Sequence, residues 1–189
     1  MQKKLIFFDG DGTLWYPKKT KRTQKPHWVY TDPETKDSYL EHLELTPGTK
    51  EVFNFLHQKN IYIVVVSANP SSEEIANKEL KERLEHFNLI DLVYTYRSSS
   101  GDNPDGKASI MLEIIRTLKL KKEQTLMVGD SYFYDYLAAK NVGIDALFIK
   151  NSVSKMPEKV PSDLKTIHEV GDLKDIIASW TASTCSMHQ

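Results

Sequence analysis

The chain has 189 residues and a formal net charge of −1 at pH 7, with 40% hydrophobic and 27% charged residues. This length fits one domain, and this composition is typical of a globular protein with a sizeable core. The near-neutral charge argues against nucleic acid as the main partner. The sequence shows no apolar run of membrane-spanning length, no signal-peptide pattern and a single cysteine, Cys185. We therefore expect a cytoplasmic protein without a disulfide framework and without a membrane partner.

Apolar runs of strand length alternate with helical patterns along the chain. The predicted strands are residues 4–8, 61–66, 92–96, 125–128 and 146–149, and the predicted helices are residues 49–59, 73–87, 107–118, 132–141 and 173–180. Continuous β-branched and aromatic strands between helices indicate a parallel sheet covered on both faces. The sequence therefore predicts an α/β fold with a doubly wound, mainly parallel sheet. We expect a single domain over residues 1–180, with a surface linker at 151–170 and a frayed tail at 181–189.

An insert interrupts the connection between the first strand and the first helix. It spans residues 17–45 and begins with a run that carries only positive charge, KKTKRTQK at residues 18–25. Residues 27–45 predict a hairpin with a turn near Asp32 and Pro33. We therefore expect a small flap after the first strand. The basic run by itself is more typical of a solvated surface than of a binding site.

Residues capable of chemistry follow several of the predicted strands. Asp9 and Asp11 follow the first strand, Ser67 follows the second, and Asp130 follows the fourth after a glycine. Lys107 begins a helix after a loop. In doubly wound sheets, ligands bind beyond the carboxyl ends of the strands. Each residue alone fits an ordinary turn, loop or helix cap, but the set predicts a catalytic site at one edge of the sheet.

The stretch FFDGDGTLW, residues 7–15, places two carboxylates two residues apart at the end of a buried strand. Like charges at this distance repel each other unless a cation lies between them. The pair therefore indicates a bound cation or a reaction that moves charge. As an alternative, Asp9 and Asp11 are a simple turn pair, because Gly10 and Gly12 also suit a tight turn.

The order and spacing of four motifs resemble the haloacid dehalogenase superfamily of phosphotransferases. The motifs are DGDGTLW at residues 9–15, Ser67 after a strand, Lys107, and GDSYFYD at residues 129–135. The resemblance covers residues 1 to about 150. Trp15 after DGTL, the small insert and the absence of a large cap domain are similar to the capless, magnesium-dependent phosphatases of that superfamily. The resemblance implies a Rossmann-like core.

The resemblance also implies a reaction and its residues. Asp9 is the expected nucleophile of a phosphomonoester hydrolase with an aspartyl-phosphate intermediate, and Asp11 is the expected general acid and base. The implied metal ligands are Asp9, the Asp11 backbone carbonyl and Asp130; the implied phosphate-binding residues are Ser67, Ala68 and Lys107. Asp135 is expected to orient Lys107 or a metal-bound water, although a solvated position on its helix fits it equally well. The expected cofactor is Mg²⁺, for which Mn²⁺ can substitute.

The flap offers four aromatic residues near this edge. Trp15, Tyr16, Trp28 and Tyr30 are expected either to offer aromatic faces to the leaving group of the substrate or to pack the flap onto the body. The expected partner is a small phosphorylated substrate or a phosphoprotein. The sequence does not distinguish sugar phosphates, nucleotides and phosphorylated amino acids.

Two other functions are weighed against this one. GDNPDGKA at residues 101–108 nearly matches a nucleotide-binding phosphate loop, but Ala108 replaces the hydroxyl residue that contacts Mg²⁺, and the two aspartates repel phosphate. The second alternative is a receiver-like domain that accepts one phosphate, or a degenerate binding protein on a similar fold. A receiver carries its phosphorylated aspartate after a later strand, where this chain has Ser67.

Overall fold

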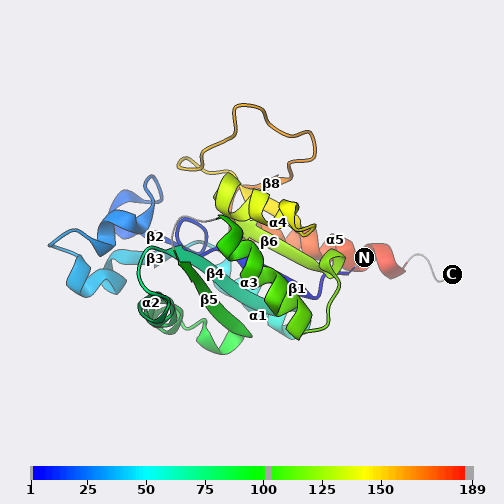
Figure 1. Cartoon of the computed structure of the whole chain (residues 1–189), viewed down its shortest axis with the longest axis horizontal. Coiled ribbons are helices and arrows are strands. Elements are labelled where there is room, and N and C mark those ends of the chain that lie inside the picture. Colours follow the sequence, from blue (N-terminus) through cyan, green and yellow to red (C-terminus); the bar gives the residue numbers. More distant parts are fainter. Residues whose placement is uncertain (1, 101–103, 186–189) are drawn as a thin grey trace.

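The computed structural model describes residues 2–100 and 104–185. Its centre is a sheet of six strands in which every neighbouring pair is parallel. In spatial order the strands are β5 (Thr95–Ser100), β4 (Tyr62–Asn69), β1 (Leu5–Phe8), β6 (Thr125–Gly129), β7 (Asp145–Ile149) and β8 (Thr166–Ile167). The predicted α/β class is thereby confirmed, and Figure 1 shows the sheet running through the molecule.

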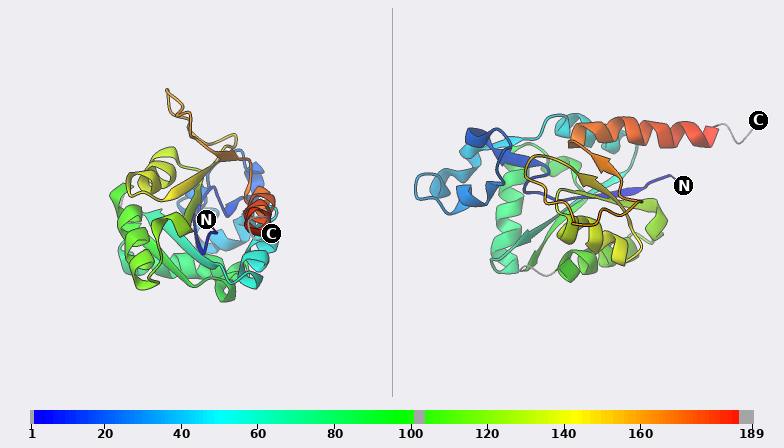
Figure 2. Two further views of the ribbon diagram at one scale, coloured as in Figure 1. Left: turned by 90° about the vertical axis from the view of Figure 1, so that its right-hand side faces the viewer. Right: turned by 90° about the horizontal axis from the view of Figure 1, so that it is seen from above.

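Helices cover both faces of the sheet because β1 is apolar on both sides. Leu5 and Phe7 pack toward one face, and Ile6 and Phe8 pack toward the other, all four fully buried. The face of Ile6 and Phe8 is covered by α1 (Thr49–Gln58), α2 (Glu73–His86) and α5 (Leu173–Cys185); the face of Leu5 and Phe7 is covered by α3 (Pro104–Thr117) and α4 (Ala138–Asn141). The two layers are visible on opposite sides of the sheet in Figure 2. A π-helical turn, Tyr132–Leu137, leads into α4.

The third predicted strand is displaced. Residues 92–96 were expected to form it, but Ile90–Leu92 is a 3₁₀ turn and β5 is Thr95–Ser100. The apolar residues of this region form the turn and pack against the core. The polar residues after them form β5, because main-chain pairing with β4 does not depend on the side chains. β4 is also longer than predicted, so Ser67 and Ala68 lie within this strand and not after it.

The C-terminal region also differs in part from the prediction. β8 lies within the residues expected to form a surface linker, and it pairs with β7. Helix α5 extends to Cys185, beyond the predicted end at residue 180. Residues 186–189 of the expected tail lie outside the described residues.

The flap, residues 17–45, is not the predicted hairpin. Its strands lie only at its two ends, where β2 (Trp15–Pro17) pairs antiparallel with β3 (Leu43–Leu45). Between them are the 3₁₀ segments Lys18–Thr20, Pro26–Tyr30 and Lys36–His42. The expected turn at Asp32 and Pro33 therefore joins two helical segments, and the Asp32 side chain accepts a hydrogen bond from the Glu34 amide.

The flap stands at one end of the sheet, opposite the end where the N-terminus lies, as the blue to cyan ribbon in Figure 1 shows. It starts where β1 ends, so it adjoins the carboxyl edge of the strands. Within residues 2–100 and 104–185, no helix combines the length and apolar character needed to cross a membrane.

Candidate active site

Asp9 lies at the carboxyl end of the central strand. β1 runs between β4 and β6, with Phe8 opposite Val65 and Val128. The Asp9 amide continues this pairing and donates to the Val128 carbonyl over 3.0 Å. Only 6% of Asp9 is exposed, and the Thr13 hydroxyl lies 3.3 Å from its Oδ2. The sheet therefore fixes the backbone of Asp9 firmly at the edge where ligands bind in this class of fold.

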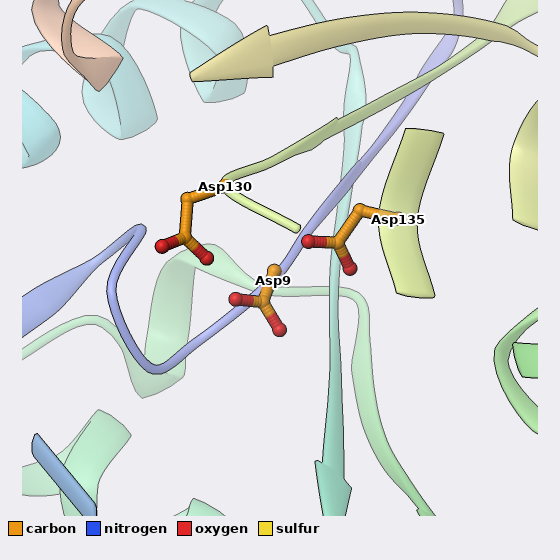
Figure 3. A group of neighbouring side chains, drawn as sticks. All are labelled: Asp9, Asp130 and Asp135. Atoms are coloured by element: carbon orange, nitrogen blue, oxygen red, sulfur yellow. The ribbon is translucent and has the colours of Figure 1, made fainter. Parts of the chain in front are cut away.

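Two further carboxylates converge on Asp9. Asp130 follows β6, and Asp135 lies on the π-helical turn after it. Figure 3 shows the three side chains directed toward one another, and one oxygen of each lies within 4.8 Å of the others. All three are buried. Such a concentration of negative charge requires cations.

Lys107 supplies one of these cations from the first turns of α3. Its Nζ lies 2.5 Å from Asp9 Oδ1 and 2.6 Å from Asp135 Oδ1, and the residue is only 2% exposed. Burial opposes the charge, but Asp135 and Asp9 outweigh it and hold the pKa of Lys107 above its ordinary value. Lys107 is therefore a permanent positive charge beside the nucleophile candidate. The nearly matching phosphate loop begins at residues 101–103, which lie outside the described residues.

Lys25 supplies the second cation, which the sequence placed in a basic run and did not assign to the carboxylates. Its Nζ lies 3.0 Å from Asp130 Oδ2 and 3.1 Å from Oδ1. Burial lowers the pKa of Lys25, but Asp130 more than offsets this, so the pKa is raised. No periodic pattern marks Lys25 among its basic neighbours; the path of the flap alone brings it to the site.

The carboxylates outnumber the ammonium groups beside them, and a divalent metal ion would neutralise the remaining negative charge. Three carboxylates face two ammonium groups, and the buried Asp130 Oδ2 is approached by Lys25 as an ion pair whose geometry is not that of a hydrogen bond. Burial, with repulsion from the neighbouring aspartates, raises the pKa of Asp130 to about 7, although Lys25 lowers it. Burial and Asp9 likewise raise the pKa of Asp135 to about 6 against Lys107. Carboxylate oxygens are the ligands that Mg²⁺ prefers.

Both oxygens of Asp135 accept short hydrogen bonds from inside the body, whereas Asp9 Oδ2 has only the Thr13 hydroxyl at 3.3 Å and Asp130 is paired only by Lys25 of the flap among the described residues. Oδ1 accepts from Lys107, and Oδ2 accepts from the Ser131 amide over 2.9 Å. Asp9 and Asp130 are thus the better candidates for direct metal contact. Asp135 lies where it holds Lys107 against Asp9.

Two glycines make this close packing possible. Gly12 has a φ of +86°, and a Cβ at this position would lie 2.6 Å from Asp130 Oδ2. A Cβ at Gly129 would overlap the Asp135 carboxylate. Glycine tolerates the positive φ at Gly12, and at both positions the missing side chain leaves room for a carboxylate of the cluster.

Asp11 lies apart from the cluster and faces the flap. Its Oδ1 accepts from Trp15 Nε1 over 2.5 Å and from the Tyr30 hydroxyl over 2.7 Å. His27 Nδ1 lies 3.8 Å from its Oδ2. Burial and the Asp11 carboxylate raise the pKa of Tyr30 well above its ordinary value, so the phenol remains a donor. The structure therefore places the side chains of the two aspartates of the DGDG turn in different surroundings.

Ser67 and Ala68 lie on β4, next to the turn after β1. Ser67 is 5% exposed, and its hydroxyl lies against Gly10 of that turn. Its carbonyl accepts from the Ser98 and Ser99 hydroxyls. Ala68 is half-buried. Both positions share the edge with Asp9, and their contact with phosphate stays a prediction.

Two of the four aromatic residues expected either to face a leaving group or to pack the flap onto the body are buried in the body. Trp15 is fully buried and stacks on Phe87 at 6.0 Å between ring centroids. Tyr16 is 3% exposed, and its hydroxyl donates to the Gly12 carbonyl. For both residues the alternative of packing onto the body therefore holds, because the first residues of the flap pair as β2 and pack inward. Trp28 and Tyr30 are half-buried on the flap.

The fold and this set of residues correspond to one family of enzymes. Residues 5–149 match the family model of haloacid dehalogenase-like hydrolases. The match covers most of the chain, and the chain therefore belongs to this family. The sequence resemblance to the superfamily is confirmed.

Relatives and solved structures agree with this assignment. A 5'-nucleotidase, YutF, of Bacillus subtilis is 34% identical over 68 residues, which are 36% of this chain and 27% of that protein. An acid sugar phosphatase of Staphylococcus aureus strain USA300 is 30% identical over 69 residues, with the same two shares. The matches thus span only about a quarter of these relatives' length.

Two solved structures share the whole fold. A HAD phosphatase from Thermococcus onnurineus has a TM-score of 0.67 and 19% identity, over 94% of this chain and 98% of that one. A haloacid dehalogenase-like hydrolase from Xanthomonas campestris has a TM-score of 0.68 and 15% identity, over 96% and 97%. At this identity the likeness concerns the fold alone.

Proposed function

We propose that this protein is a Mg²⁺-dependent phosphomonoester hydrolase that forms an aspartyl-phosphate on Asp9. The observation that carries the proposal is the position of Asp9. Its carboxylate lies at the end of the central strand, 2.5 Å from a buried lysine, and one of its oxygens is within 4.8 Å of an oxygen of the buried Asp130 carboxylate. A nucleophile, a fixed positive charge and a metal-binding oxygen thus share one small volume.

The residues divide the reaction into two displacements. In the first, a carboxylate oxygen of Asp9 bonds to phosphorus, the bond from phosphorus to the leaving oxygen breaks, and Asp11 gives that oxygen a proton. In the second, Asp11 takes a proton from water, the water oxygen bonds to phosphorus, and the bond to Asp9 breaks. The net reaction consumes one water and releases an alcohol and phosphate.

Charge stabilisation accompanies both displacements. Lys107 and Ser67 would bind phosphoryl oxygens, and Asp135 would hold Lys107 in place through its 2.6 Å contact. Asp9, Asp130 and the Asp11 carbonyl would hold Mg²⁺, which when bound neutralises the charge between the phosphate and the carboxylates.

The relatives suggest the first substrates to test. Nucleoside 5'-monophosphates and sugar phosphates are the classes named by the 5'-nucleotidase and the acid sugar phosphatase. We propose a small phosphomonoester from one of these classes as the substrate.

Turnover tests the proposal. The protein is incubated with 4-nitrophenyl phosphate and then with a panel of these monoesters, in Mg²⁺, in Mn²⁺ and in excess EDTA. We expect many turnovers per molecule with either metal and loss of activity in EDTA. Full activity in EDTA would refute the metal assignment, and a single turnover would favour a receiver-like phosphate acceptor.

A further inference from the structure

The flap contacts Asp11 through a phenol. The Tyr30 hydroxyl donates to Asp11 Oδ1 over 2.7 Å, and Trp15 Nε1 donates to the same oxygen over 2.5 Å. Trp15 comes from the fully buried strand β2, whereas Tyr30 belongs to the 3₁₀ segment Pro26–Tyr30. One carboxylate oxygen is therefore held from two directions.

Tyr30 itself is held by the body of the protein. Arg83 of α2 is only 3% exposed, and its guanidinium lies over the Tyr30 ring at 4.4 Å and over the Tyr39 ring at 5.2 Å. The two rings meet edge to face at 5.4 Å, and the Tyr39 hydroxyl donates to Glu82 Oε2 over 2.8 Å. A buried guanidinium between two aromatic faces restricts the position of both rings. The Tyr30 hydroxyl is thus directed at Asp11 by a rigid helix and not only by the flap.

We infer that Tyr30 is a positioning residue for the proton transfer by Asp11. The inference rests on the proposed phosphatase function. Two donors occupy Oδ1, so Oδ2 is the oxygen left to exchange a proton with the leaving group and with water. Tyr30 and Trp15 thereby select the oxygen that gives its proton to the leaving group and later takes one from water, and they fix the orientation of the carboxyl plane.

This role makes a specific chemical prediction. A poor leaving group, such as an alkyl alcohol, needs the proton as the bond to phosphorus breaks, whereas 4-nitrophenolate leaves without one. The quantity kcat/KM reports steps up to departure of the leaving group and excludes the later hydrolysis of the phospho-enzyme. Loss of Tyr30 positioning therefore lowers kcat/KM for an alkyl phosphate far more than for 4-nitrophenyl phosphate.

The test uses Tyr30→Phe, with Tyr39→Phe as the matched control. Each variant loses one flap hydroxyl and keeps the aromatic ring that packs on the Arg83 guanidinium. Of the two hydroxyls, that of Tyr30 contacts Asp11, whereas that of Tyr39 contacts Glu82. We expect Tyr30→Phe to lower kcat/KM about tenfold for an alkyl phosphate and less than about twofold for 4-nitrophenyl phosphate. Tyr39→Phe should leave both values near wild type. In an Asp11→Asn background, Tyr30→Phe should cause no further loss, because it acts through Asp11.

Each outcome decides a separate question. If the wild type hydrolyses neither substrate, the proposed function is wrong and the role of Tyr30 falls with it. If the wild type is active but Tyr30→Phe lowers both substrates equally, lowers neither, or adds its loss to that of Asp11→Asn, the positioning role is refuted and the phosphatase stands. Melting temperatures near the wild-type value would assign a selective loss in Tyr30→Phe to the missing hydroxyl. A lowered melting temperature with an equal loss on both substrates would contradict the positioning role.

Discussion

The carboxyl edge of the sheet and the flap contribute to the same site in different ways. The edge presents Asp9 and Asp130 directly after the neighbouring parallel strands β1 and β6; both are almost fully buried, and the Asp9 amide continues the main-chain pairing to Val128. The flap consists of short 3₁₀ segments that reach the site through the ends of long side chains, Lys25 and Tyr30. The edge therefore holds the groups that react, and the flap holds groups that contact them.

This difference predicts an order of effects. Changes at the edge remove a group that reacts or that would hold the metal ion, so they should lower activity by large factors. Changes on the flap remove a contact to a reacting group whose own position the sheet still fixes, so they should alter binding or selectivity by smaller factors. Variants of the two regions can thus confirm or break the division.

The largest effect is expected at the nucleophile. Asp9→Asn keeps the shape of the side chain but removes the attacking oxygen's charge, so turnover of 4-nitrophenyl phosphate should fall by at least about 10³-fold. Steady-state rates in Mg²⁺ measure this, with the far-ultraviolet circular dichroism spectrum as the check on folding. Activity near the wild-type level would place the nucleophile elsewhere.

The second effect concerns Asp11 and separates the two halves of the reaction. Asp11→Asn should slow steady-state hydrolysis about 10²-fold or more, because neither the leaving alcohol nor the attacking water has its proton carrier. With 4-nitrophenyl phosphate the first half still proceeds, so phosphorylated Asp9 should accumulate. Acid quenching followed by intact-mass analysis should detect an added phosphoryl group that hydroxylamine removes and that Asp9→Asn does not form.

The third effect is a pH dependence of stability in metal-free protein. The pKa values of Asp130 and Asp135 are raised to about 7 and about 6 in the fold, whereas in the unfolded chain they titrate near about 4. Between these values the folded protein binds more protons than the unfolded chain, so the free energy of unfolding falls as the pH rises. Urea denaturation in EDTA at pH 5 and pH 7.5 should show this fall, of a few kcal/mol at most.

Asp130→Asn provides the control for this dependence. It removes one buried charge, so in EDTA at pH 7.5 the variant should be more stable than the wild type by on the order of 2 kcal/mol, with a smaller difference at pH 5. Mg²⁺ should stabilise the wild type and not the variant. If the free energy of unfolding changed with pH in the same way in both proteins, the pKa of Asp130 would not be raised in the fold.

The sequence predicted the edge better than the flap for a physical reason. Apolar runs mark buried strands, and the carboxyl ends of parallel strands share one edge, so Asp9 and Asp130 could be brought together without coordinates. The same reasoning placed the third strand too early, because the apolar residues before it pack as a turn and Thr95–Ser100 pairs through its main chain. Side-chain patterns do not report main-chain pairing.

The flap carries no comparable signal. Its alternation of aromatic and polar residues suggested a hairpin, but the 3₁₀ segments bury only Pro26, Val29 and a few neighbours and depend on contacts with distant parts of the chain. Arg83 is an example: it reads as a surface residue of α2, yet it is buried beneath two flap tyrosines. Lys25 is another example: it pairs with Asp130, whereas Lys21 of the same basic run is exposed, and the sequence does not distinguish the two. Contacts between elements far apart in sequence are not periodic and escape this kind of reading.

The smallest effect is expected at Lys25, and it concerns the affinity for Mg²⁺. The Lys25 ammonium lies 3.0 Å from Asp130 Oδ2, so in metal-free protein it partly neutralises the carboxylate that Mg²⁺ needs. Its side chain is 30% exposed, and solvent therefore weakens the interaction. Lys25→Met should tighten Mg²⁺ binding by about three- to tenfold, as measured by isothermal titration calorimetry.

Lys21→Met is the matched control, because Lys21 is an exposed lysine of the same flap. It removes the same charge from the surface, so any general effect of net charge on Mg²⁺ affinity appears in both variants and is screened by salt. A difference between the two variants that persists at high ionic strength would assign the effect to direct competition at Asp130. Equal affinities, or weaker binding in Lys25→Met, would mean that the flap does not compete with the metal, and that the edge alone sets the chemistry of the site.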